Sequence, residues 1–177
     1  LNSNNDIKKK DYVNFQKMII QRSDGKPIAY LTNKKLFWKY EFFVNEKVLI
    51  PRPETEIIIE QVLRIYKTKN KLNFLDIGFG SGCILLSILK ERNNFVATGI
   101  DISDQALKVC KINAYKLGVK NRVKLFKSDI DKFCFGKYDL IVSNPPYINS
   151  YDIKYLESDV VKFEPSLALD GGIDGLS

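Results

Sequence analysis

The chain has 177 residues, of which 45% are hydrophobic, enough for one core of ordinary size and one principal domain. It contains no histidine, which excludes Ser-His-Asp and Cys-His catalysis and histidine-based metal sites within it. The formal net charge of +7 would suit a polyanionic partner such as RNA, but the basic residues are scattered. Solvated lysine-rich faces are the better explanation of the charge, and direct nucleic-acid binding is left open.

Cysteine usage and hydropathy bear on the compartment. Cys83, Cys110 and Cys134 are widely spaced and lack Cys-x-x-Cys pairing, so we interpret them as buried thiols in a reducing environment and expect no metal site. No apolar run approaches the length of a membrane span, and residues 1–12 lack the apolar core of a signal peptide. We therefore expect a cytoplasmic protein that does not contact a membrane.

The amino-terminal third predicts a helix, a hairpin and a second helix. Residues 1–11 are polar and predicted to be frayed, and apolar residues at helical spacing predict a short amphipathic helix over residues 11–22. Residues 36–51 are aromatic and β-branched with a polar interruption at 45–47, which predicts a β-hairpin that turns there. Residues 52–67 begin with prolines and acids and end with basic residues, which predicts a helix.

From residue 72 onward, strand and helix patterns alternate. The predicted strands are residues 72–78, 95–101, 122–129 and 138–144, and the predicted helices are residues 82–92 and 103–118. Ser103 is the expected N-cap of the second helix, and Gly118 its stop. The alternation predicts an α/β fold with a mainly parallel sheet and helices on both faces, in which residues 138–144 form a buried central strand. Because only four strands are accounted for, we expect the chain to be part of a longer protein.

A glycine-rich loop follows the first of these strands. Gly78, Gly80 and Gly82 stand where the strand ends and a helix begins, so backbone N–H groups there can approach a ligand closely. The spacing differs from the G-x-G-x-x-G of dinucleotide sites and suits a ligand without a pyrophosphate. Asp101 ends the second strand, where a carboxylate can accept hydrogen bonds from ribose hydroxyls.

Two residues after the third strand are weaker candidates for nucleoside binding. Asp129 could accept a hydrogen bond from the exocyclic amine of adenine, and Ile130 could pack on the adenine ring. An ordinary turn aspartate explains Asp129 nearly as well.

The fourth strand ends in "SNPPYI". A planar nitrogen attacks poorly unless acceptors hold its N–H groups as positive charge develops. The side-chain oxygen of Asn144 and the carbonyl of Pro145 can supply those acceptors, and Tyr147 can cover the flat group. Together with a nucleoside site, this predicts methyl transfer from a sulfonium to nitrogen without a general base. The plain alternative is a strand terminator.

The motifs "LDIGFGSGCI", "GID" and "SNPPYI" resemble those of class I S-adenosylmethionine-dependent methyltransferases of the N-P-P-Y type. With "GKPIAYLTNKKLFWKYEFFVNEKVLIPRPETE" and "EPSLALDGGIDGLS", the chain is similar to the HemK/PrmC family of protein-(glutamine-N5) methyltransferases over nearly its whole length. The resemblance implies a Rossmann-like fold and methylation of a glutamine side chain in class-1 peptide-chain release factors.

The resemblance also implies a set of site residues and domains. S-adenosyl-L-methionine, leaving as S-adenosyl-L-homocysteine, would contact Gly78, Phe79, Gly80, Ser81, Gly82, Asp101, Asp129, Ile130 and Asn144, while Asn144, Pro145, Pro146 and Tyr147 would hold the glutamine. Residues 49–56 would form a wall between cofactor and substrate. Residues 1–24 would be the remnant of an N-terminal helical domain, 25–53 a β-hairpin linker, and 54–177 a methyltransferase domain with incomplete C-terminal strands.

Rival functions share these motifs. One is a glutamine methyltransferase of a ribosomal protein, and another is a nucleic-acid methyltransferase acting on adenine-N6 or guanine-N2. A non-catalytic module with the cofactor fold and one half of a bifunctional methyltransferase fusion are further alternatives. We expect a monomer whose partner is a release factor.

Overall fold

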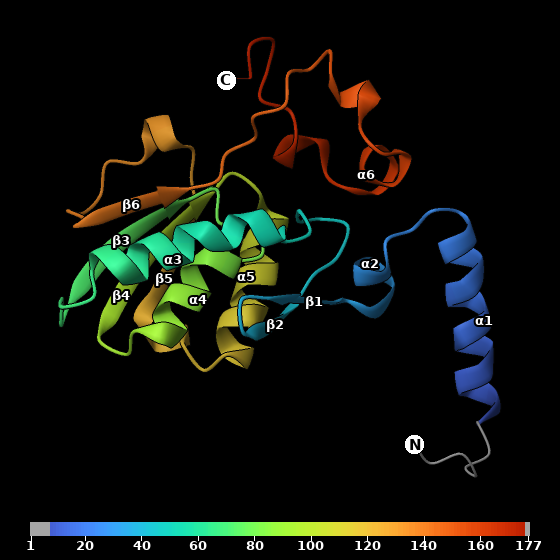
Figure 1. Ribbon diagram of the computed structural model, residues 1–177, viewed down its shortest axis with the longest axis horizontal. Helices are drawn as coiled ribbons and strands as arrows, with labels where there is room; N and C mark the ends of the chain where they lie inside the picture. The colour runs from blue at the N-terminus through green and yellow to red at the C-terminus, as the bar shows by residue number, and fades with distance from the viewer. Residues whose placement is uncertain (1–7, 176–177) are drawn as a thin grey trace.

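The structure is a computed structural model that describes residues 8–175. Its helices and strands are α1 (Lys9–Ser23), α2 (Ile28–Thr32), β1 (Lys34–Phe37), β2 (Tyr40–Phe43), α3 (Glu56–Ile65), β3 (Leu72–Ile77), α4 (Cys83–Glu91), β4 (Phe95–Asp101), α5 (Asp104–Lys116), β5 (Val123–Lys127), β6 (Leu140–Ser143) and α6 (Ser158–Phe163). Short 3-10 helices are η1 (Pro53–Thr55), η2 (Lys120–Arg122), η3 (Ile130–Lys132), η4 (Ile153–Tyr155) and η5 (Ser166–Ala168). Figure 1 shows a sheet with packed helices, a hairpin beside it and α1 standing apart.

The main sheet is parallel and has the strand order β5-β4-β3-β6. Its register pairs Leu72 with Phe95 and Ile77 with Ile100, so the two strands that carry the glycine loop and Asp101 are neighbours. The α/β class is confirmed. The central position predicted for residues 138–144 is wrong within the described chain, because β6 is an edge strand and Ile141 on it is 58% exposed. An apolar, β-branched strand cannot reveal from its own sequence how many neighbours it has.

Within the described residues, α3, α4 and α5 cover one face of this sheet. Phe74 and Ala97 point to that face and join the hydrophobic core, whereas Val96 and Ile141 on the opposite face are exposed. The connections β3-α4-β4 and β4-α5-β5 step in the same direction, and right-handed crossovers then place both helices on the same side. The helices expected on both faces are therefore found on one face of the part described.

The predicted hairpin exists, but its turn is elsewhere. β1 and β2 pair antiparallel with Phe37 opposite Tyr40, so the chain turns at Trp38 and Lys39 and not at residues 45–47. Asn45 instead makes a separate turn: its carbonyl accepts the N–H of Val48 at 3.1 Å and its side chain accepts the N–H of Lys47 at 3.0 Å. The polar interruption in the sequence thus marks the exit from β2.

Hydrogen bonds from helices fix the hairpin against the sheet. Glu91, at the end of α4, accepts from the Trp38 indole N–H at 3.0 Å and the Tyr40 hydroxyl at 2.9 Å. The buried amide of Asn113 in α5 accepts the N–H of Phe43 at 2.7 Å and donates to its carbonyl at 2.9 Å. Because one amide satisfies both backbone groups of Phe43, the end of β2 is held in register with α5.

The ends of the chain differ partly from expectation. The helix predicted over residues 11–22 is confirmed as α1, but it begins at Lys9, so residues 9–11 are helical and not frayed; residues 1–7 lie outside the described part. Ser103 caps α5 by accepting the N–H of Ala106, as predicted, and Gly118 follows that helix with φ +70°. No helix in the described chain is long and apolar enough to cross a membrane.

The cysteine prediction is only partly right. Cys110 is buried and Cys83 half-buried, whereas Cys134 is exposed in the loop between β5 and β6. Spacing alone did not reveal that this loop lies on the surface.

Candidate active site

The candidate site lies along the edge where the parallel strands end. Gly78 follows β3, Asp101 ends β4, Asp129 follows β5, and Asn144 follows β6. From β3 the chain steps through β4 to β5 and then returns to the other side of β3. Loops diverge at such a reversal, which is where open α/β sheets bind ligands. The glycine loop consequently stands between Asp101 and Asn144.

Two glycines of the loop differ in the space around them. Gly80 has φ +53°, and a Cβ built on it would meet nothing within 4 Å, so its backbone faces free space. Gly82 has φ +81°, and a Cβ there would lie 2.5 Å from Cys110 Sγ and 2.9 Å from Leu86 Cδ1. Gly80 therefore leaves room for a ligand, while Gly82 lets the start of α4 pack closely on α5.

Asp101 holds the glycine loop in place through hydrogen bonds to the backbone. One carboxylate oxygen accepts the N–H of Gly80 at 2.9 Å and the other accepts the N–H of Ser103 at 2.9 Å. Burial raises the pKa of Asp101 above its usual range, although these backbone N–H groups oppose the shift. Each carboxylate oxygen can accept a further hydrogen bond, so Asp101 can hold the loop and still accept hydrogen bonds from hydroxyl groups.

Asp76 is a candidate that the sequence reasoning missed. It is the next-to-last residue of β3, is 1% exposed, and neither carboxylate oxygen has a hydrogen-bond partner among the described residues. Burial raises the pKa of Asp76 to about 8, although the nearby backbone N–H of Leu85 opposes the shift. An acid between Leu75 and Ile77 in an apolar strand was the signal that could have identified it.

Phe79 contributes to the glycine loop through its buried ring, and Ser81 through its backbone carbonyl. Both are buried, and the Phe79 ring lies so close to Gly99 that a Cβ there would be 2.8 Å from Phe79 Cδ1. The carbonyl of Ser81 accepts a hydrogen bond from Asn113 at 2.9 Å. The same buried amide thus ties the glycine loop to the hairpin.

The adenine candidates sit one strand further along. Asp129 caps η3, and its side chain accepts the N–H of Asp131 at 3.2 Å, which is the turn geometry named above as the alternative. Ile130 is 48% exposed and free to pack on a ring. Their adenine role stays a prediction.

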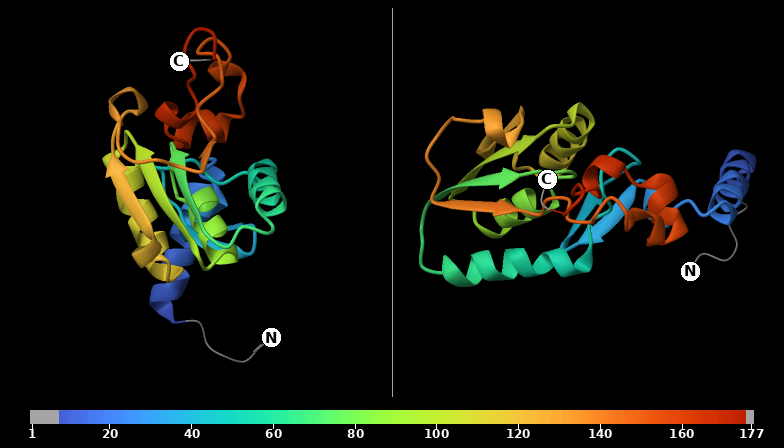
Figure 2. Two further views of the ribbon diagram at one scale, coloured as in Figure 1. Left: turned by 90° about the vertical axis from the view of Figure 1, so that its left-hand side faces the viewer. Right: turned by 90° about the horizontal axis from the view of Figure 1, so that it is seen from above.

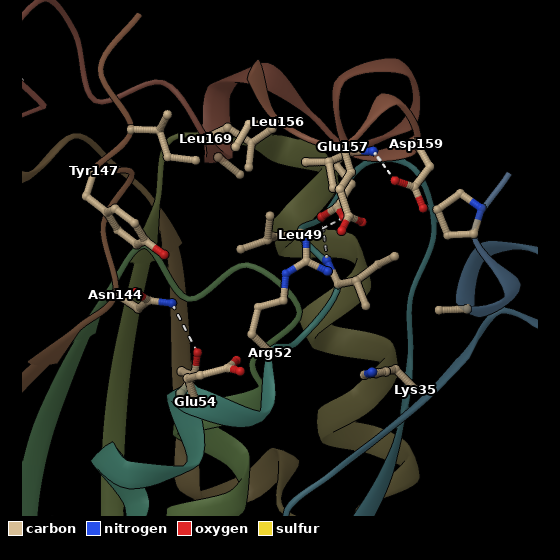
Figure 3. A pocket seen from close by; sticks show the side chains of 18 of the residues that line it. Lys35, Leu49, Arg52, Glu54, Asn144, Tyr147, Leu156, Glu157, Asp159 and Leu169 are labelled. Carbon is tan, nitrogen blue, oxygen red and sulfur yellow. Dashed lines mark hydrogen bonds and ion pairs between the residues drawn. The ribbon is translucent and has the colours of Figure 1, made fainter. Parts of the chain in front are cut away.

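Asn144 and Pro145 present unused acceptors. The amide nitrogen of Asn144 donates a long hydrogen bond of 3.5 Å to Thr55 Oγ1, which orients the side-chain oxygen away from Thr55. In the described chain, neither that oxygen nor the carbonyl of Pro145 accepts a hydrogen bond. Tyr147 is 71% exposed and lies on the same side of the pocket as Asn144, as Figure 3 shows.

A pocket of about 850 Å³ opens beside Asn144. Asn144, Pro145 and Tyr147 line one side, and other walls come from Leu49 and Thr55, which belong to the segment 49–56 expected to form a wall. Its lining contains no residue of the glycine loop and not Asp101. Because β3 and β6 are neighbours, the site has two adjoining parts: an open glycine-loop part and a pocket on the Asn144 side.

The described residues contain no group of three or more His, Cys, Asp or Glu side chains placed to hold a metal ion.

The chain is similar to known methyltransferases. It is 42% identical over 176 residues to the "Release factor glutamine methyltransferase" of Buchnera aphidicola subsp. Schizaphis graminum, covering 99% of this chain and 63% of that protein. The protein of the same name from Caulobacter vibrioides is 43% identical over 158 residues, covering 89% of this chain and 55% of that protein. A "Bifunctional methyltransferase" of Rickettsia typhi is 38% identical, covering 92% of this chain and 35% of that protein.

The chain thus spans 55% and 63% of the length of the two release factor methyltransferases named. The family described as "Methyltransferase small domain" matches residues 54–162, more than half of the chain. That range includes the glycine loop, Asp101 and the N-P-P-Y segment. The chain belongs to the methyltransferase small domain family.

Proposed function

We propose that this chain is the catalytic part of an enzyme that methylates the side-chain nitrogen of a glutamine in a class-1 peptide-chain release factor. The observation that carries the proposal is the placement of unused acceptors at Asn144 and Pro145 beside a pocket, one strand away from the glycine loop. Similarity to release factor glutamine methyltransferases over 99% of the chain supports the choice of substrate.

The residues present fit S-adenosylmethionine as cofactor. The open space at Gly80 admits a ligand against the backbone, and Asp101 retains acceptor capacity for ribose hydroxyls. The ammonium group of the methionine part would give the orphaned carboxyl of Asp76 a partner and favour its ionised form. When bound, S-adenosylmethionine supplies an electrophilic methyl group on a sulfonium.

The chain's own residues then activate the accepting nitrogen. Asn144 Oδ1 and the Pro145 carbonyl each accept a hydrogen bond from one N–H of the glutamine amide. Both hydrogen bonds strengthen as positive charge develops on the nitrogen. Tyr147 covers the planar amide and limits its rotation. The nitrogen loses one proton to water after the methyl group has arrived, so no general base is needed. Pro146 contributes rigidity to this segment.

The test is to incubate the full-length protein and S-adenosylmethionine labelled in its methyl group with release factor, ribosomes and tRNA in separate reactions. Label on a release factor glutamine supports the proposal. Label on a ribosomal protein or on tRNA would replace it with one of the rival activities, and no transfer to any of them would leave a non-catalytic module. The same preparation tests the expected monomeric state by light scattering. A cytoplasmic location is expected of an enzyme with this substrate.

A further inference from the structure

Residues 148–172 form a loop that closes on itself over the pocket, and we call it the roof loop. Its two ends are joined where the N–H of Ile148 donates to Leu169 at 3.2 Å and the N–H of Gly171 donates to Ile148 at 2.8 Å. The loop starts directly after Tyr147, so its base is continuous with the segment proposed to hold the glutamine. Figure 2 shows this part of the chain reaching from the sheet across to the hairpin side.

The far end of the roof loop is attached through Glu164. Its carboxylate accepts from the Arg52 guanidinium at 2.5 Å and from the N–H of Ile50 at 3.2 Å. The Glu164 side chain is 1% exposed and that of Arg52 is 37% exposed. Among the described residues, the one other hydrogen bond from the roof loop to the chain before β6 is made by the exposed Lys162 to the carbonyl of Asp24.

Apolar packing at this end comes from a partly buried side chain, because Phe163 packs against the hydrophobic core. Helix α6 has six residues, none of them buried, and it lies just before Glu164. A buried carboxylate is strongly destabilising without its partner, so the position of the loop end depends on the contact with Arg52 in addition to the packing of Phe163. Arg52 also projects into the middle of the pocket, as Figure 3 shows, so this contact lies within the cavity it helps to close.

We propose that Arg52 and Glu164 are positioning residues: their ion pair holds the roof loop over the pocket and so sets how well the peptide substrate is held beside Asn144. The substrate part of this inference rests on the function proposed above, whereas the effect on the roof loop does not. Since neither residue lines the glycine loop, the pair acts on substrate binding and leaves cofactor binding alone.

Amide hydrogen exchange on the full chain tests the structural half without any substrate. Glu164→Gln keeps an acceptor for Ile50 but removes the charge, and Arg52→Lys keeps the charge but removes the planar donor pair. Glu41→Gln is the matched control, because it breaks an exposed ion pair with Lys34 in the hairpin. Loss of a charge-assisted hydrogen bond should raise exchange in residues 148–172 about tenfold or more, with β3 and β4 unchanged.

Two exchange results would overturn the proposal. One is a roof loop that exchanges in both variants at the rate of Glu41→Gln. The other is faster exchange spread evenly over β3 and β4, since that would mean general loss of stability.

Kinetics tests the functional half. Both variants should raise KM for the release factor about tenfold, change kcat less, and leave the dissociation constant of S-adenosylmethionine within about twofold of wild type. The double variant Arg52→Glu with Glu164→Arg, which swaps the two charges, should recover part of the affinity for the release factor that the single variants lose. If amide exchange in the roof loop rises but KM for the release factor does not, the ion pair is structural only and the proposal fails. If the wild-type protein labels no release factor, the proposed function fails while the exchange result stands.

Discussion

Alanine substitutions at two glycines of the same loop should have different effects, one mainly on stability and the other mainly on cofactor binding. Gly82→Ala places a Cβ 2.5 Å from Cys110 Sγ and 2.9 Å from Leu86 Cδ1, and it does so at φ +81°. Left-handed backbone costs a non-glycine residue about 1–2 kcal/mol, and overpacking a core costs about 1–3 kcal/mol more. We therefore expect Gly82→Ala to lower the free energy of unfolding by about 2–5 kcal/mol, a large share of a typical domain's stability.

Gly80→Ala meets no neighbour within 4 Å, so only the backbone cost of about 1–2 kcal/mol applies to folding. Its methyl group instead occupies the space proposed for S-adenosylmethionine. Gly118→Ala is the matched control, because Gly118 has φ +70°, also meets nothing within 4 Å, and lies at the far end of α5. Gly80→Ala and Gly118→Ala should therefore destabilise the fold equally.

Thermal unfolding and calorimetric titration with S-adenosylmethionine separate these effects. For a chain of this size, 1 kcal/mol shifts the Tm by about 2–4 °C, so Gly82→Ala should lose about 4–20 °C and the other two variants about 2–8 °C. Only Gly80→Ala should bind the cofactor at least about tenfold more weakly while still folded. If Gly80→Ala bound as well as Gly118→Ala, the cofactor would not lie against this loop.

Three further outcomes follow from the site. Asp101→Ala should weaken S-adenosylmethionine binding by about 1.5–3 kcal/mol, from lost charge-assisted hydrogen bonds, and unchanged affinity by calorimetry would remove Asp101 from the site. Asn144→Ala should lower kcat by roughly 10² to 10³, and Asn144→Asp should keep cofactor binding while turnover falls; a wild-type single-turnover rate in Asn144→Ala would contradict this role. Burial raises the pKa of Asp76 from 3.8 to about 8, so the folded state keeps a proton that the unfolded state releases, and stability should fall between those pH values. Asp76→Asn should flatten that fall in thermal melts recorded across this pH range, and an unchanged slope would refute the assignment.

Local patterns in the sequence were enough for the fold class and for the segments that line the candidate site. The alternation of strand and helix periods predicted the parallel sheet, and the cap at Ser103 and the stop at Gly118 bounded α5 because both signals act within a few residues. The N-P-P-Y segment indicated acceptors at a strand end for the same reason. These features depend on backbone dihedral preferences and on hydrogen bonds between near neighbours.

Other features depended on contacts between distant residues. Arg52 and Glu164 are 112 positions apart, and Asn113 reaches Phe43 across 70 positions, so no local period encodes either contact. The place of the hairpin turn depended on which side chains α4 and α5 could bond, and the edge position of β6 on the order of the strands. Tertiary structure decided these because a side chain's partners and burial are set by the elements brought beside it, and a strand's own pattern records only the alternation of its faces.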